Sequence, residues 1–149
     1  MFTIKEVKTK KQQKEFVEFP IKLYKKCPYF VPPLYGDEIA MFKKDYHYYD
    51  QAESIFFNAY DENNKMVGRI QGILQNASNE KWNQKRVRFT RFDCIDNQEV
   101  ANLLFNTVEN WAKGKNMEEN KNIYCCLPVY YDWKYNRYSN YAYAFSEKD

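Results

Sequence analysis

The feature that most constrains this chain is a strand-like segment that runs directly into a long amphipathic helix. The strand-like segment at 86–95, with its apolar run around Phe89 to Ile95, ends where a helical pattern begins at Asp96. Asp96 is the expected N-cap, Glu99 follows three residues later as in a capping box, and Gly114 suits the C-terminal end. One continuous apolar stripe follows the helix: Val100, Leu103, Leu104, Val108 and Trp111. Such a junction points unpaired backbone N–H groups beyond the strand tip, where phosphates bind.

Two further strand-like segments precede this junction and are joined by a turn. Residues 52–60 alternate in polarity, residues 61–64 form a polar turn cluster, and residues 66–75 form the partner of a hairpin. Gly68 and Gly72 fall on the apolar face of the second segment. Glycine in a strand often marks close approach of another element, so we expect one to pack there.

The strand at 86–95 breaks strict alternation, because Phe89 and Phe92 lie three residues apart. A β-bulge would bring both rings to the core. Alternatively, one ring packs on each face of a strand that is buried on both sides. The sequence leaves these two interpretations open.

The N-terminal part of the chain reads as a strand followed by helices. Residues 2–7 alternate as a short strand, and residues 10–18 form a helix. Pro20 is expected to begin a second helical segment, because the first turn of a helix tolerates its missing N–H. A proline-rich block at 28–34 holds the chain extended, and residues 37–44 form a short helix. The predicted order is β-α-α-β-β-β-α followed by a short C-terminal strand, an α+β fold.

Composition narrows the classes of function. With 149 residues the chain most simply forms one domain, and no apolar run approaches the roughly 20 residues of a membrane span. The net charge of +3 is too small to favour a nucleic-acid partner. The N-terminus lacks an apolar signal core, so a cytoplasmic protein is expected. No phosphate-binding G-x-x-x-x-G-K motif occurs, and no metal-binding spacing is found among Cys27, Cys94, Cys125 and Cys126.

A few polar residues are candidates for chemistry. Asp93, near the end of its strand, could accept a proton from an amine, or it could be a solvated carboxylate, and Glu53 is a weaker candidate of the same kind. Glu99 is a cap rather than a general base. His47, the one histidine, lies in a polar aromatic loop and is more typical of a surface or packed residue. Four arginines could attract phosphate or form a solvated face: Arg69, Arg86, Arg88 and Arg91.

The proline-rich block carries the most specific resemblance to a known family. It reads Phe19-Pro20-x-x-Leu23-Tyr24-x-x-x-Pro28-Tyr29-Phe30-Val31-Pro32-Pro33-Leu34. It is followed in order by Val67-Gly68-Arg69-Ile70, Phe89-x-x-Phe92-Asp93, Glu99-Val100-Ala101-x-x-Leu104-Phe105 and Trp111-Ala112. With the order of elements, these motifs resemble the GCN5-related N-acetyltransferase (GNAT) superfamily, in a bacterial branch of acetyltransferase-like proteins. The resemblance covers about residues 2–117.

This resemblance implies a three-layer fold with a mixed, mostly antiparallel sheet and helices on both faces. It also implies acetyl-CoA or another acyl-CoA as the donor, attacked directly by an amine. The backbone of 95–101 would hold the pyrophosphate, and an N–H near 92–94 would bind the thioester carbonyl. The implied cofactor-binding residues are Phe92, Cys94, Ile95, Asp96, Asn97, Gln98, Glu99, Val100 and Ala101, with Asp93 as the catalytic candidate and no metal.

The chain departs from the family pattern in two places. The family loop usually reads Q/R-x-x-G-x-G/A, whereas residues 96–101 contain no glycine and two carboxylates, which repel a pyrophosphate. The resemblance also ends near residue 117. We therefore expect an acyl-CoA N-acyltransferase-like domain at 1–117. The tyrosine-rich segment at 118–149, with an edge strand at 123–131, would be a truncated, frame-shifted or divergent end of the same domain.

Two functions follow. The first is an acyl-CoA-dependent N-acyltransferase that transfers an acetyl or other acyl group to an unidentified amine. The alternative is a non-catalytic GNAT-like remnant that binds a protein partner through its tyrosine-rich tail. A nucleic-acid binder that uses the arginines and interleaved aromatic residues fits the modest charge less well, and no membrane partner is expected. An unpaired sheet edge would be covered in a homodimer.

Overall fold

The computed structural model describes residues 1–116, 123–125, 131–132 and 137–138, and the structural statements below refer to these residues. The strands are β1 (Thr3–Glu6), β2 (Ala52–Tyr60), β3 (Met66–Gln75), β4 (Val87–Cys94), β5 (Ile123–Cys125), β6 (Tyr131–Asp132) and β7 (Arg137–Tyr138). The helices are α1 (Lys10–Leu23), α2 (Tyr35–Ala40), the short 3-10 helix η1 (His47–Asp50), α3 (Asn76–Trp82) and α4 (Gln98–Gly114).

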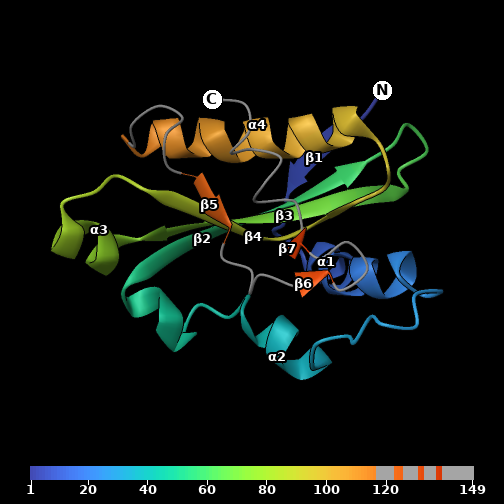
Figure 1. Cartoon of the computed structure of the whole chain (residues 1–149), viewed down its shortest axis with the longest axis horizontal. Helices are drawn as coiled ribbons and strands as arrows, with labels where there is room; N and C mark the ends of the chain where they lie inside the picture. Colours follow the sequence, from blue (N-terminus) through green and yellow to red (C-terminus); the bar gives the residue numbers. More distant parts are fainter. Residues whose placement is uncertain (117–122, 126–130, 133–136, 139–149) are drawn as a thin grey trace.

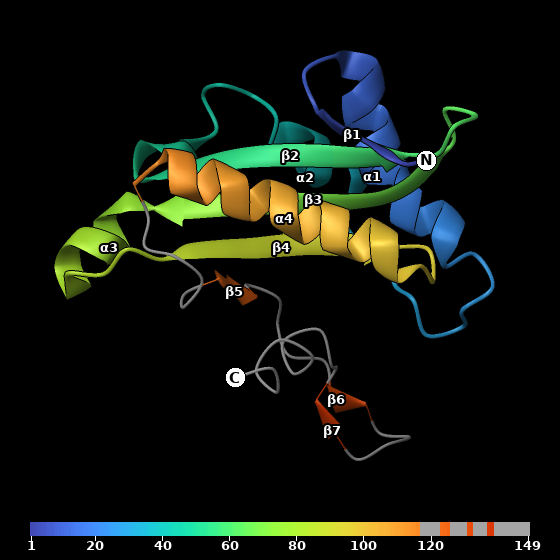
Figure 2. The same ribbon diagram turned by 90° about the horizontal axis from the view of Figure 1, so that it is seen from above.

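The elements form three layers around one central sheet. The sheet has the order β1-β2-β3-β4-β5; its first four strands are antiparallel, and β5 runs parallel to β4. Helix α4 covers one face, and α1 and α2 cover the other (Figures 1 and 2). This arrangement confirms the predicted mixed α+β fold. β6 and β7 form a separate antiparallel pair.

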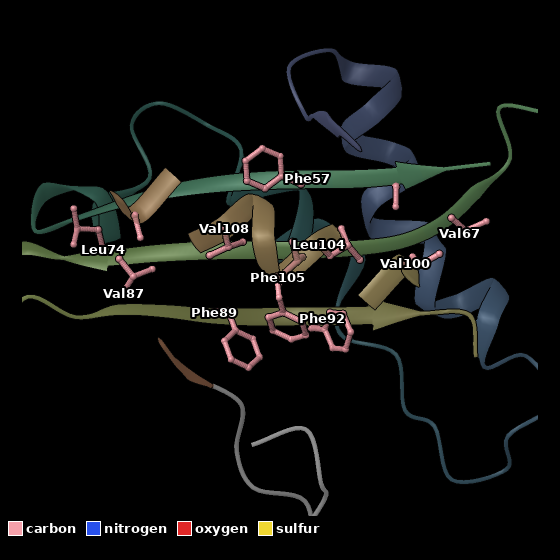
Figure 3. Close-up of a cluster of buried hydrophobic side chains, with 13 residues drawn as sticks. Phe57, Val67, Leu74, Val87, Phe89, Phe92, Val100, Leu104, Phe105 and Val108 are labelled. Atoms are coloured by element: carbon pink, nitrogen blue, oxygen red, sulfur yellow. The ribbon is translucent and has the colours of Figure 1, made fainter. Parts of the chain in front are cut away.

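The main core lies between α4 and the sheet (Figure 3). Val100, Leu104 and Val108 are fully buried, which confirms three of the five positions of the stripe predicted along this helix. Trp111 is partly buried against the same core, and Leu103 is also only partly buried. Gly68 and Gly72 lie beneath it: a Cβ built on Gly68 would lie 2.9 Å from Leu104 Cδ1, and one on Gly72 would lie 3.2 Å from Val108 Cγ1. The close approach expected at the two glycines is therefore confirmed.

A β-bulge in β4 resolves the irregular spacing of its two phenylalanines. The register between β3 and β4 shifts between Arg69 and Gln71, and Arg91 has the left-handed φ of 49°. The bulge turns Phe89 and Phe92 onto the same face, where their ring centroids lie 4.9 Å and 4.5 Å from that of Phe105. The interpretation that places one ring on each face is wrong.

Pro20 does not begin a new helix. It lies inside α1, which runs unbroken from Lys10 to Leu23 after a capping box formed by Thr9 and Gln12. A proline in a helix removes the N–H that would bond the carbonyl four residues earlier, here Phe16 O. Arg69 Nη1 donates to that carbonyl at 2.9 Å instead. The tertiary hydrogen bond compensates for the missing one, and the helix continues.

Two other expectations need correction. The side chain that caps α4 is Asn97, not Asp96, and the helix begins at Gln98. The short helix expected at 37–44 is α2 at Tyr35–Ala40, and α3, between β3 and β4, was not expected at all. Of the edge strand predicted at 123–131, β5 forms the first part, and residues 126–130 lie outside the described residues.

Candidate acyl-CoA site at the β4–α4 junction

The bulge and the start of α4 lie at the same end of the sheet. Strand β5 pairs with β4 only at Val87, Arg88 and Phe89. Beyond Phe89, the outer edge of β4 has no strand partner among the described residues. The bulge begins two residues later, and α4 starts four residues after Cys94. Within the described part of the chain, the junction thus brings together a strand edge without a partner, a bulged backbone and a helix N-terminus.

The backbone of the junction is closed by its own hydrogen bonds. Ile95 N donates to Val67 O at 2.9 Å, and Asn97 N donates to Ile95 O at 2.7 Å. Asn97 Oδ1 accepts hydrogen bonds from the N–H groups of Glu99 at 3.0 Å and Val100 at 3.2 Å. The amide side chain therefore occupies two of the N–H groups that the sequence analysis assigned to a pyrophosphate.

Asp93 is not a solvated carboxylate. Arg69 Nε donates to its Oδ2 at 2.8 Å, and the hydroxyl of Tyr24, at the end of α1, donates to its Oδ1 at 2.8 Å. The Arg69 side chain is only 6% exposed, and that of Asp93 16%. Burial lowers the pKa of Arg69, while the Asp93 carboxylate opposes this change. Both carboxylate oxygens are thus occupied by structural contacts, which disfavours the proton-accepting role suggested for Asp93.

Arg91, the bulged residue, is also held by an ion pair. Its Nε and Nη2 donate to the two carboxylate oxygens of Glu38 at 2.9 Å and 2.8 Å, and its Nη1 donates to Gln71 Oε1 at 2.8 Å. Burial lowers the pKa of Arg91, but the hydrogen bonds and charge of Glu38 outweigh it, and the net shift is upward. Arg69 and Arg91 are therefore neither a solvated face nor cations available to a phosphate.

Cys94 ends β4 with its side chain partly buried against the core of α4. Burial, together with the charges of Asp93 and Asp96, raises the pKa of its thiol from 9.0 to about 11. The thiolate is the reactive form of cysteine, and a raised pKa leaves less of it at neutral pH. Cys94 is therefore a packing residue at this junction rather than a nucleophile.

Alkylation is expected to distinguish Cys94 from the exposed Cys27. Because its pKa is about two units above the ordinary value, the thiolate fraction of Cys94 at pH 8 is about 100-fold lower than that of an unperturbed thiol. Iodoacetamide at pH 8, followed by mass spectrometry of peptides, should label Cys27 before Cys94. The rate at Cys94 should rise steadily up to about pH 11. A rate at Cys94 that levels off near pH 9 would contradict this assignment.

The other sequence candidates lie away from the junction. His47 borders a hollow of about 370 Å³ together with Tyr48, Gln51, Ala52, Gln75, Ala77 and Ser78. Gln75 is at the opposite end of β3 from Gly68, which pairs with Cys94. Glu53 accepts a hydrogen bond from Lys115 Nζ at 2.8 Å, which lowers its pKa. The structure therefore groups neither His47 nor Glu53 with the predicted site.

The part of the chain that the structure describes contains no group of three metal-ligating side chains. It also contains no helix that is long and apolar enough to cross a membrane.

Similar folds are found among solved acetyltransferases. A protein described as a GNAT-family acetyltransferase from Staphylococcus aureus matches with a TM-score of 0.57 and 17% identity, over 79% of this chain and 69% of that chain. This chain has a GNAT fold. A protein described as a predicted acetyltransferase from Clostridium acetobutylicum, solved with acetyl-CoA, matches with a TM-score of 0.58 and 11% identity, over 99% of this chain and 88% of its own. An aminoglycoside acetyltransferase from a soil metagenome, solved with sisomicin, matches with a TM-score of 0.57 and 14% identity, over 99% of this chain and 88% of that chain.

Sequence comparison finds a relative of higher identity. Protein YghO of Escherichia coli K12 is 26% identical over an alignment 111 residues long, which covers 71% of this GNAT-fold chain. The chain spans about a quarter (27%) of the length of that relative. No protein-family model matches the sequence.

Sequence reasoning missed the polar network on the α1 and α2 face of the sheet. This face carries Asn58, Arg69, Gln71 and Thr90, all buried, and Glu38 reaches it from α2. Arg69 and Gln71 are alternate residues of β3, and Asn58 lies between apolar neighbours in β2; that pattern was the available signal. Polar residues at such positions usually indicate a solvated face, and only the packing of α1 and α2 over them shows otherwise.

Proposed function

We propose that this chain is an acyl-CoA-binding domain of the N-acyltransferase type, which transfers an acyl group to an amine. The observation that carries the proposal is the bulge in β4, which lies beside a strand edge that has no partner among the described residues and is followed by the N-terminus of α4. The GNAT fold of the chain supports the same assignment.

The junction offers two kinds of backbone donor to such a ligand. The first turn of α4 would hold the pyrophosphate through those N–H groups of 95–101 that are not bonded to backbone carbonyls, among them Glu99 and Val100, aided by the helix dipole. An N–H in the segment 92–94 would donate to the thioester carbonyl and to the negative charge that develops on it. When bound, acyl-CoA supplies the activated thioester. The protein contributes the orientation of the thioester and the exclusion of water.

The residues at the junction fit a pyrophosphate only after one side chain moves. Asn97 Oδ1 occupies the N–H groups of Glu99 and Val100, and Asp96 and Glu99 add negative charge. Asn97 is only partly buried, and a change in its side-chain rotamer would free both N–H groups without moving the backbone. Anion binding and capping by Asn97 therefore compete for the same donors.

This competition predicts a gain of affinity. Replacing Asn97 with glycine removes the competing oxygen, and glycine at an N-cap costs helices only a few tenths of a kcal/mol. The variant is expected to bind CoA about 3- to 10-fold more tightly than the wild type, the equivalent of one released hydrogen bond. Isothermal titration calorimetry with CoA measures the change.

Asn83→Gly is the matched control. Asn83 has a left-handed φ of 47° after α3, where glycine is tolerated, and it lies at the end of the sheet away from the junction. This variant should leave the affinity for CoA unchanged. An Asn97→Gly protein that is folded but binds CoA no better than the wild type would refute the assignment of these N–H groups to the pyrophosphate.

Thermal unfolding tests the proposed function itself. A ligand that binds only the folded state stabilises it by about 2.7 kcal/mol at 100 times its dissociation constant. CoA and acetyl-CoA should therefore both raise the melting temperature of the wild type. The absence of any shift with either ligand would contradict acyl-CoA binding.

A second candidate is a non-catalytic domain that binds a protein partner. It is favoured by an exposed apolar strip in the α1–α2 connection: Tyr29, Val31 and Leu34 are 90%, 84% and 74% exposed. Apolar side chains at such exposure are typical of interaction surfaces. Most of the tyrosine-rich tail, the segment expected to bind a partner, lies outside the described residues.

A further inference from the structure

A buried carboxylate on α2 holds the β4 bulge from the opposite face of the sheet. Glu38 is only 6% exposed although α2 is a short surface helix. It lies 53 residues before Arg91 in the sequence, and its two oxygens accept both bonds of a fork-like pair from that guanidinium. Such bidentate pairs fix geometry as well as charge.

The bulge needs this support because its backbone is unfavourable. Arg91 has a φ of 49°, a conformation that costs a residue with a Cβ about 1–2 kcal/mol. Strained conformations persist where surrounding contacts over-determine them. Glu38 and Gln71 supply those contacts by holding the side chain of Arg91 from two directions.

A second set of contacts holds β4 two residues later. Asp93 is fixed by Tyr24 from α1 and by Arg69 from β3. The Phe92 ring, between them, packs on Phe105 of α4 on the opposite face. The N–H groups of Phe92 and Asp93 thus lie between two anchored side chains, that of Cys94 directly follows the second, and Glu38 provides the anchor on the bulge itself.

We propose that Glu38 is a positioning residue for the acyl-binding edge: through Arg91 it fixes the bulge and with it the N–H groups of 92–94. This inference rests on the proposed function, because those N–H groups are the ones assigned to the thioester carbonyl. The pyrophosphate loop is held by other bonds, those of Ile95 and Asn97. Loss of Glu38 should therefore disturb recognition of the acyl group and leave recognition of the nucleotide part intact.

Glu38→Gln tests the proposal with two ligands that differ only in the acetyl group. The variant keeps the size of the side chain but removes the charge and one acceptor. The dissociation constant of acetyl-CoA should rise about threefold or more relative to that of CoA, as expected for one weakened hydrogen bond. The dissociation constant of CoA should change less than about twofold. A protein that is merely destabilised would lose affinity for both ligands to the same extent.

Asn58→Ala is the matched control for lost buried polar contacts. Asn58 lies on the same face of the sheet but on β2, two strands away from β4, and bonds Tyr60 and Gln12. This variant should leave the ratio of the two dissociation constants unchanged. The double variant Glu38→Gln/Arg91→Gly should restore the ratio toward the wild-type value, because glycine adopts a positive φ without an anchor.

Hydrogen exchange provides a readout that needs no ligand. In Glu38→Gln, the amides of 92–94 should exchange about tenfold faster or more relative to those of α4, and in Asn58→Ala they should not. If the wild type binds neither CoA nor acetyl-CoA, the proposed function fails. Hydrogen exchange of the amides of 92–94 then still tests whether Glu38 fixes the bulge. Unchanged relative protection of 92–94, or an equal loss of affinity for both ligands, would overturn the proposal. If Glu38→Gln does not fold, Glu38→Gln/Arg91→Gly is compared with Arg91→Gly. Because glycine at position 91 needs no anchor, the two proteins should show equal protection of the amides of 92–94, and a difference would overturn the proposal.

Discussion

Replacing Asp93 with alanine is expected to lower the free energy of unfolding by about 3–5 kcal/mol. The carboxylate is the ion-pair partner of Arg69, whose side chain is 6% exposed. Its removal leaves a buried guanidinium without its counter-charge, and also leaves the Tyr24 hydroxyl without this acceptor. Urea unfolding followed by circular dichroism measures the loss.

Two companion variants show whether the ion pair is the cause. Asp93→Asn keeps the shape of the side chain and an acceptor oxygen but not the charge. Its free energy of unfolding should therefore lie between those of the wild type and Asp93→Ala. In the double variant Arg69→Met/Asp93→Ala no buried charge is left alone, so its cost should be smaller than the sum of the two single costs. A loss below about 1 kcal/mol for Asp93→Ala, as for an exposed carboxylate, would contradict the described geometry.

Gly68→Val is expected to destabilise the protein by about 3 kcal/mol or more, at the upper end of overpacking costs. Even a Cβ at this position would meet Leu104 Cδ1 at 2.9 Å and Cys94 Cβ at 3.0 Å. The first atom belongs to α4 and the second to β4, so relief requires both the helix and the neighbouring strand to shift. The same urea titration measures the effect.

Gly36→Val is the matched control for the glycine in β3. A Cβ at Gly36 would meet nothing within 4 Å, and valine is no worse than glycine in a helix. The substitution should change the free energy of unfolding by no more than about 0.5 kcal/mol. Equal costs for the two variants would mean that α4 does not approach β3 at Gly68 as described.

The elements that sequence predicted well are those whose signal is local. The stripe at Val100, Leu104 and Val108 has the period of one helix face, and it is the fully buried face of α4. Gly68 and Gly72 indicate from the sequence that another element approaches β3 closely, although they do not show that this element is α4. The spacing of the phenylalanines in β4 posed the question of a bulge, but only the register could answer it.

The features that sequence did not predict depend on contacts far along the chain. Pro20 interrupts the hydrogen bonds of a helix, and only Arg69 of β3 makes the unbroken helix possible. Asp96 and Asn97 are both good N-caps, and local pattern does not choose between them. The ion pair of Glu38 with Arg91 could not be predicted, because nothing in either segment shows that α2 packs over β4.

The central claim, that acyl-CoA binds at the β4–α4 junction, is tested most directly by a titration of the ¹⁵N-labelled protein with acetyl-CoA followed by NMR. The account predicts chemical-shift changes concentrated at residues 90–101, with none at the hollow beside His47 and Gln75. Shifts confined to that hollow or to another surface would contradict it, and so would an unchanged spectrum at millimolar ligand.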